Sequence, residues 1–189
     1  MSNNKNNNIL MNAIRAEDLG NFETHQQILD EDIDLRYTNS RFQKLKGLGP
    51  RTKGMYGERY LEELMTKEGI KCIGPDNTDH DRIIFVDIPQ LGLKGRIKVE
   101  VKMSFLWKGT DHGRFQQIRQ GQDYDIIVFI MVYPEAMEFF MATKAMIQKQ
   151  NLPNQHGGKK AKSGTICIDC DPRKVSWMIP LEVFPHPES

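Results

Sequence analysis

The most constraining feature of this sequence is a nearly uninterrupted apolar run, DIIVFIMVY, at Asp125–Tyr133. Its β-branched and aromatic residues favour a strand, and it is far shorter than the roughly 20 residues that cross a bilayer. A strand that is apolar at successive positions is typically buried on both faces. We therefore expect this strand to lie inside a sheet that is covered on both sides.

Other segments complete an α/β (α+β) domain around this strand. A helix is expected at Thr52–Lys67, because apolar residues recur there at helical spacing and Gly69 follows at the position of a C-terminal cap. Three extended runs come next, and Arg114–Arg119 fits a short helix before the apolar strand. The predicted order is therefore α-β-β-β-α-β. The three extended runs are Ile70–Ile73, Arg82–Ile88 and Ile97–Phe105, and the later segments are a strand at Met137–Ala142, a helix at Lys144–Lys149 and extended pieces at Gly164–Asp169 and Val175–Phe184.

The length of 189 residues fits one domain of ordinary size. Residues 1–8 are polar and rich in asparagine, so we expect a disordered tail followed by a single domain over 9–189. Within that domain, we expect a helical arm at 9–50, the core at 51–142 and a C-terminal extension at 143–189. The extension is basic in part.

Charge, cysteine content and hydropathy limit the partners and the cellular compartment of the protein. The formal net charge is +1, so the total charge by itself indicates no nucleic-acid partner. An odd number of cysteines, three, argues against a disulfide framework and favours a reducing cytoplasm. Cys167 and Cys170 form a CxxC pair, but a single pair cannot complete a tetrahedral zinc site. Since no apolar run is long enough to span a membrane, we expect a soluble, cytoplasmic protein.

The candidate chemistry begins on the third extended run. Strand alternation places Val99, Val101 and Met103 on one face, while Glu100 and Lys102 project together from the other. An ion pair on an exposed edge strand is the structural alternative for these two residues. Placing charges among apolar residues costs desolvation energy, so such a pair either neutralises itself or serves a site.

Two further carboxylates could join this pair. Asp81 begins the preceding strand, and a tight antiparallel hairpin would bring it beside Glu100, depending on the register. Glu58 lies at the edge of the apolar face of the helix and can reach inward, although it could equally be a solvated glutamate. Converging carboxylates repel one another, and a hard divalent cation such as Mg²⁺ relieves this repulsion by accepting their oxygens.

Asp81 and the triplet Glu100-Val101-Lys102, set in this order of elements, resemble the PD-(D/E)XK nuclease superfamily and particularly its type II restriction endonucleases. The resemblance covers Lys53 to Tyr133 and implies a central mixed β-sheet flanked by helices. Pro75-Asp76 is a literal PD pair and Asp79 is a further acidic candidate, so either aspartate could replace Asp81 in the motif. We prefer Asp81 because it immediately precedes an apolar strand.

The resemblance also implies residue roles. Asp81 and Glu100 would ligate Mg²⁺ together with the backbone carbonyl of Val101, and Mn²⁺ should substitute for Mg²⁺. Lys102 would position or help activate the attacking water, and Glu58 would support the metal site through a water or occupy a second metal position. Gln117 could orient the motif lysine or contact DNA, and a loop with three lysines could contact phosphates, unless it is simply a basic surface loop. These lysines are Lys159, Lys160 and Lys162, and they make the C-terminal extension a candidate for DNA recognition.

We therefore expect a Mg²⁺-dependent endonuclease that cuts double-stranded DNA. A sequence-specific type II enzyme acting as a homodimer, in a prokaryotic or phage-like setting, is the reading that the resemblance favours. A structure-specific nuclease of DNA repair or recombination is one alternative. A non-catalytic DNA-binding module on the same scaffold is another, but it would be expected to lack Asp81, Glu100 or Lys102.

Overall fold

A mixed β-sheet forms the centre of the molecule in the computed structural model, which describes residues 34–150, 152–155 and 164–181. Within these residues, the sheet has the order β1-β2-β3-β5-β6-β8. β3 and β5 are parallel, and every other neighbouring pair is antiparallel. The expected mixed sheet is therefore confirmed. The strands are β1 (Lys71–Ile73), β2 (Arg82–Phe85), β3 (Arg96–Phe105), β5 (Ile126–Val132), β6 (Met137–Thr143) and β8 (Ile179–Pro180).

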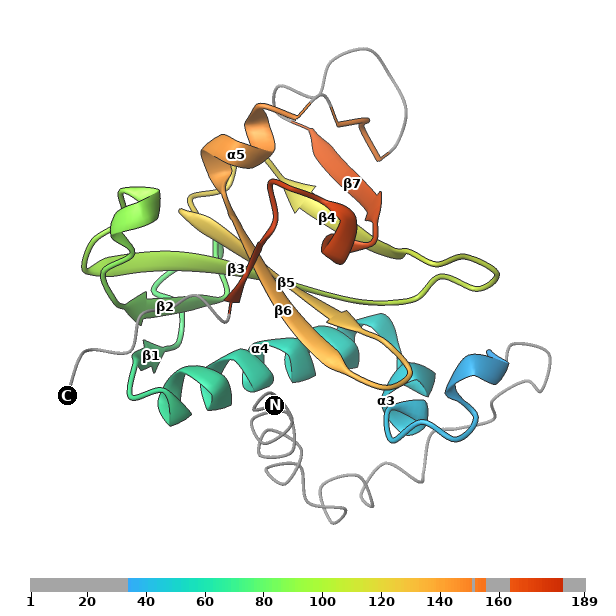
Figure 1. Ribbon diagram of the computed structural model, residues 1–189. Helices are drawn as coiled ribbons and strands as arrows, with labels where there is room; N and C mark the ends of the chain where they lie inside the picture. Colours follow the sequence, from blue (N-terminus) through green and yellow to red (C-terminus); the bar gives the residue numbers. More distant parts are fainter. Residues whose placement is uncertain (1–33, 151, 156–163, 182–189) are drawn as a thin grey trace.

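β5 lies between β3 and β6, and each of its residues is buried. Its side chains alternate between two hydrophobic clusters, with Val128 and Ile130 in one cluster and Ile127 and Phe129 in the other. The first cluster includes side chains of α4, and the second includes side chains of a small sheet made of β4 (Gly113–Arg119) and β7 (Thr165–Cys170). Figure 1 shows α4 and this small sheet on opposite sides of the central sheet. The sequence prediction of a strand buried on both faces is confirmed.

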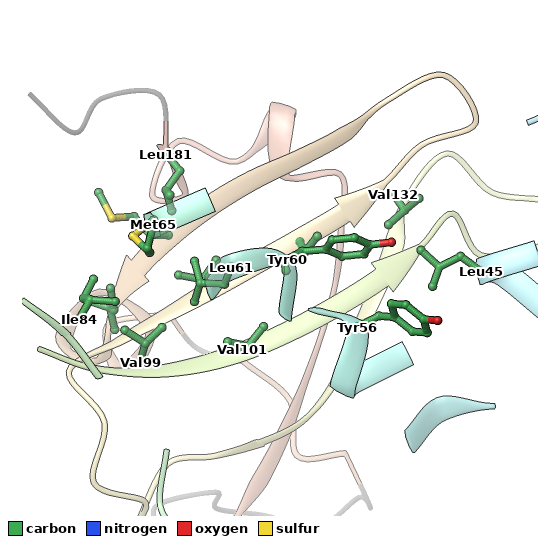
Figure 2. Close-up of a cluster of buried hydrophobic side chains, with 14 of the residues drawn as sticks. Leu45, Tyr56, Tyr60, Leu61, Met65, Ile84, Val99, Val101, Val132 and Leu181 are labelled. Atoms are coloured by element: carbon green, nitrogen blue, oxygen red, sulfur yellow. The ribbon is translucent and has the colours of Figure 1, made fainter. Parts of the chain in front are cut away.

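Helix α4 (Pro50–Lys67) covers one face of the sheet. Figure 2 shows Tyr60 and Leu61 of this helix lying over Val99 and Val101 of β3. The helix ends at Lys67, and Gly69 terminates it as expected, because this glycine adopts a φ of 71° and the Ile70 N–H bonds the Met65 carbonyl at 2.8 Å. The helix therefore holds a fixed position over the strand that carries the candidate motif.

The segment expected to be a short helix is instead a strand, β4 (Gly113–Arg119), which pairs antiparallel with β7 (Thr165–Cys170). Phe115 and Ile118 are both buried, and their spacing of three residues resembles one turn of a helix. In a regular strand these two side chains would face opposite ways, but the register shifts between them. This bulge turns both side chains inward, so the predicted α-β-β-β-α-β order is wrong at its second helix.

The remaining elements described in this part of the chain are short helices and 3-10 turns. In the expected arm, the described part holds a 3-10 turn at Leu35–Tyr37 and a five-residue helix, α3 (Gln43–Gly47), while residues 1–33, including the expected tail, lie outside it. The expected helix at 144–149 is α5 (Lys144–Gln148), and two further 3-10 turns occupy Pro89–Leu91 and Pro172–Lys174.

Two strands of the C-terminal extension complete sheets of the core. β7 pairs with β4, and β8 pairs with β6 at the edge of the central sheet. β8 is much shorter than the extended piece expected at 175–184. The domain boundaries themselves stay a prediction. No helix among the described residues has the length and apolar character to cross a membrane.

Candidate active site

Glu100 and Lys102 lie on the face of β3 that is turned away from α4. Their neighbour Ser104 shows the direction, because its Oγ accepts the Arg114 N–H of β4 at 2.8 Å. The Lys102 Nζ lies 2.6 Å from the Glu100 Oε1, and the Glu100 side chain is only 7% exposed. The alternation predicted for β3 therefore places a nearly buried carboxylate and an ammonium in direct contact.

The charge state of Glu100 reflects this position. Burial raises the pKa of its carboxyl above the ordinary value, the Lys102 ammonium opposes that shift, and the negative charge of Asp81 adds to it. The Arg119 guanidinium also lowers the pKa but does not reverse the direction. The positive charge around Glu100 thus does not offset its burial, and a cation arriving there would stabilise the ionised form.

Asp81 lies beside the Glu100–Val101 peptide, at the point where β2 begins. Its carboxylate Oδ2 accepts the Val101 N–H at 2.7 Å, and its own N–H donates to the Val99 carbonyl at 2.9 Å. The N–H and C=O of one residue in a strand point to the same side, so the Val101 carbonyl also lies on the Asp81 side of β3. The register thus brings together the three groups that the resemblance names as metal ligands.

The two alternative aspartates are placed differently. Asp76 pairs with the Arg96 guanidinium, and its Oδ1 lies 3.2 Å from the His80 Nε2. The Asp79 backbone N–H donates to the Asn77 Oδ1 at 2.8 Å in a local turn. Among the three aspartates, Asp81 is the one whose carboxylate bonds the backbone of the Glu100-Val101-Lys102 triplet.

Glu58 reaches inward from α4, but toward an arginine. Its Oε2 accepts a hydrogen bond from the Arg82 Nη1 at 2.8 Å, and the same nitrogen donates to the Asp81 carbonyl at 2.7 Å. Burial and the charge of Asp81 raise the pKa of Glu58, while Arg82 lowers it. Arg82 thus ties α4 to Asp81, the residue that precedes β2.

Sequence analysis missed Arg82, although a signal was present. Arg82 directly follows Asp81, and alternation along a strand sends consecutive side chains to opposite faces. Arg82 therefore turns toward α4, where Glu58 and Glu62 are available. The Arg119 guanidinium of β4 lowers the pKa of Glu100, and the negative charge of Glu100 raises the pKa of Tyr124, which lies in the segment before β5. Neither interaction follows from the sequence prediction, which makes Arg114–Arg119 a helix.

Gln117 lies at the bulge of β4 and has a φ of 57°, which a residue other than glycine rarely adopts. Its N–H donates to the Gln155 Oε1 at 2.7 Å, so the bulge is fixed to the segment before β7. Its side chain is exposed, and its expected role toward Lys102 or DNA stays a prediction. The three lysines expected to contact DNA, Lys159, Lys160 and Lys162, lie outside the described residues.

The donors at this site suit a hard divalent cation. Across the described parts of the chain, no three His, Cys, Asp or Glu side chains form a ready-made metal-binding group. The expected set differs from such a group, since it combines the Asp81 and Glu100 carboxylates with the Val101 carbonyl. All three donors are oxygens, which Mg²⁺ prefers, and Mg²⁺ ordinarily keeps several waters in place of further protein ligands. The residues present therefore fit Mg²⁺.

No protein-family model and no curated protein matches the sequence. Among solved structures, the chain is similar to a bacterial homing endonuclease, I-Ssp6803I, with 19% sequence identity and a TM-score of 0.44. The match covers 64% of this chain and 75% of the other.

Proposed function

We propose that this protein is a Mg²⁺-dependent endonuclease that hydrolyses phosphodiester bonds in double-stranded DNA. The observation that supports this most strongly is the setting of Glu100. Its carboxylate is nearly buried and lies 2.6 Å from the Lys102 Nζ, yet burial still raises its pKa above the ordinary value. A carboxylate kept in that state is costly unless it serves a ligand. The Asp81 carboxylate beside it, bonded to the Val101 N–H, supplies the second oxygen donor.

The position of each residue supports a role in this proposal. Asp81, Glu100 and the Val101 carbonyl would hold Mg²⁺, which supplies a Lewis acid for the charge that develops on the phosphoryl oxygens. Lys102 projects from the same face as Glu100 and would orient the attacking water or stabilise that developing charge. Glu58, through its bond to Arg82, would hold the start of β2 in place rather than ligate the metal directly.

The finer proposal is a sequence-specific enzyme of the type II restriction class that acts as a homodimer, so that two sites cut two strands. The resemblance of the Asp81 and Glu100-Val101-Lys102 motif to that class supports this proposal. The presence of all three charged motif residues argues against a non-catalytic DNA-binding module. A structure-specific nuclease would use the same site, so the substrate distinguishes the two enzymatic readings.

The test is to incubate the purified protein and Mg²⁺ with long duplex DNA, and separately with branched DNA, and to separate the products by size. Discrete fragments from the duplex would support a site-specific enzyme. A smear, or preferential cutting of the branched substrate, would support the structure-specific reading. If neither DNA is cut with Mg²⁺ or Mn²⁺, yet the protein still binds duplex DNA, the nuclease proposal is wrong.

A further inference from the structure

Tyr124 has a buried hydroxyl with no hydrogen-bond partner among the described residues. The residue as a whole is only 3% exposed, so bulk water does not readily satisfy the hydroxyl. An unpaired buried donor is unfavourable, and those found in native proteins call for an explanation. A partner present only in the working state of the site is one such explanation.

The position of Tyr124 is fixed relative to β3. The next residue, Asp125, bonds Lys98 twice, because its N–H donates to the Lys98 carbonyl at 2.9 Å and its Oδ2 accepts the Lys98 N–H at 2.7 Å. On the other side of Tyr124, the Lys144 Nζ donates to the Gln122 carbonyl at 2.5 Å. Both ends of this short segment are therefore held, and the ring has little freedom to move away.

The ring lies on the face of the sheet that carries the motif. Tyr124 belongs to the same buried cluster as Ile127 and Phe129. In the parallel pairing of β3 with β5, Ile127 is the partner of Glu100 and Phe129 is the partner of Lys102. Tyr124 thus lies on the same face of the sheet as the two motif residues, on the side opposite α4.

The electrostatics agree with this placement. Burial raises the pKa of the Tyr124 hydroxyl to about 12, and the second cause of the shift is the negative charge of Glu100. At neutral pH the phenol is therefore protonated and can act as a donor toward a carboxylate.

We propose that Tyr124 is a positioning residue for Glu100, and that its hydroxyl donates a hydrogen bond toward the Glu100 carboxylate, directly or through one water, when a divalent cation is bound. The inference rests on the proposed function, because it assigns Glu100 to the metal. A hydrogen bond to a ligating carboxylate fixes its orientation, and loss of such a partner typically weakens metal binding about 10-fold to 100-fold.

The test compares Tyr124→Phe with Tyr37→Phe, a matched control. Tyr37 is 2% exposed, but its hydroxyl donates to the Val132 carbonyl at 2.6 Å and accepts the Leu106 N–H at 3.1 Å. Mn²⁺ binding is measured by calorimetry without DNA, together with the denaturant midpoint of unfolding. Tyr124→Phe should weaken Mn²⁺ binding about 10-fold and leave the midpoint unchanged or higher. Tyr37→Phe should lower the midpoint and leave Mn²⁺ binding unchanged.

The outcomes separate this inference from the proposed function. If the unmodified protein binds Mn²⁺ and Tyr124→Phe binds it equally well, the positioning role is wrong and the nuclease proposal stands. A midpoint that falls in Tyr124→Phe as far as in Tyr37→Phe would also overturn it, because the hydroxyl would then serve the fold. If the unmodified protein neither binds Mn²⁺ nor cuts DNA, the proposed function fails and the inference fails with it.

Discussion

The side chains of Asp34 and Glu100 are both nearly buried and both contact a lysine, but the pKa values of the two carboxyls are shifted in opposite directions. Their side chains are 6% and 7% exposed, and each contacts a lysine, Lys46 at 2.7 Å and Lys102 at 2.6 Å. The pKa of Asp34 is nevertheless held well below its usual range, mainly by the Arg36 guanidinium, whereas burial raises the pKa of Glu100. Similar exposure and one lysine therefore do not decide the charge state of a carboxylate.

The difference comes from the remaining neighbours. Asp34 accepts two side-chain hydrogen bonds and a backbone N–H from Arg36, in addition to the lysine. Glu100 has a second carboxylate, Asp81, nearby, and its burial outweighs the effect of Lys102. Asp34 is thus neutralised by groups that also hold the fold together, since Arg36 and Lys46 bond carbonyls of the β3–β4 connection. The ionised form of Glu100 can therefore still be stabilised by a further cation.

The largest effect that should follow from this contrast is on cleavage. Glu100→Gln should slow single-turnover cleavage about 1000-fold or more, because losing several kcal/mol of metal-assisted stabilisation costs a factor of ten for each 1.36 kcal/mol. The unfolding free energy should stay the same or rise, since a buried charge is removed. Quench-flow or gel kinetics at saturating protein, with denaturant unfolding, check both. Cleavage at the normal rate by Glu100→Gln would remove this residue from the site.

Lys102→Ala should have the next largest effect. Removing one fixed positive charge near a reacting centre lowers the rate of the chemical step about 100-fold to 1000-fold. Affinity for DNA should change much less, because the effect is greatest when charge develops in the transition state. Binding measured in Ca²⁺, which should support association but little cleavage, separates the two quantities. A normal single-turnover rate at saturating protein would show that Lys102 is only the structural partner of Glu100.

At the other carboxylate, Asp34→Asn should affect stability and leave the saturated cleavage rate unchanged. At neutral pH we expect a loss of about 2 kcal/mol, as for hydrogen bonds to a charged group. The pKa of folded Asp34 is lowered, so its contribution is fully present above the ordinary aspartate pKa of about 3.9 and is lost as the pH falls below it. Unfolding curves at several pH values should therefore converge for the two proteins in acid. A difference that grows in acid would contradict this.

Glu58→Gln should have the smallest effect. Glu58 already accepts a hydrogen bond from Arg82 at 2.8 Å, so we expect it to support the site indirectly. The substitution should therefore lower the single-turnover cleavage rate about 10-fold. Arg59→Gln is the control, because Arg59 pairs with Glu63 on the same helix at 3.0 Å and should leave the rate unchanged. A loss as large as that of Glu100→Gln would instead make Glu58 a direct metal ligand.

The sequence predicted those features that depend on local patterns. The apolar run of β5, the glycine after α4 and the alternation along β3 each reflect neighbours close in the chain, and the structure has all three. β4 was mistaken for a helix because Phe115 and Ile118 are three residues apart, and a bulge cannot be distinguished from a helical turn by spacing alone.

Register and tertiary contact account for the rest. The distance from Asp81 to the Val101 N–H depends on how β2 pairs with β3, which a single sequence leaves open. Arg82 and Tyr124 have ordinary settings in the sequence, and their relation to the site appears only when α4, β3 and β5 are packed together. The proposed metal ligands could thus be predicted from the sequence, whereas the residues that pack around them could not.

The central claim is that the Asp81, Glu100 and Lys102 site cuts DNA with a divalent cation. The most direct test is the single-turnover cleavage rate of duplex DNA as Mg²⁺ is titrated into protein first stripped with EDTA, with Glu100→Gln measured in parallel. We expect no cleavage in EDTA, a rate that rises to saturation with Mg²⁺, and almost no cleavage by Glu100→Gln at any Mg²⁺ concentration. A rate that is the same in EDTA and in Mg²⁺, or equal in the two proteins, would contradict the claim.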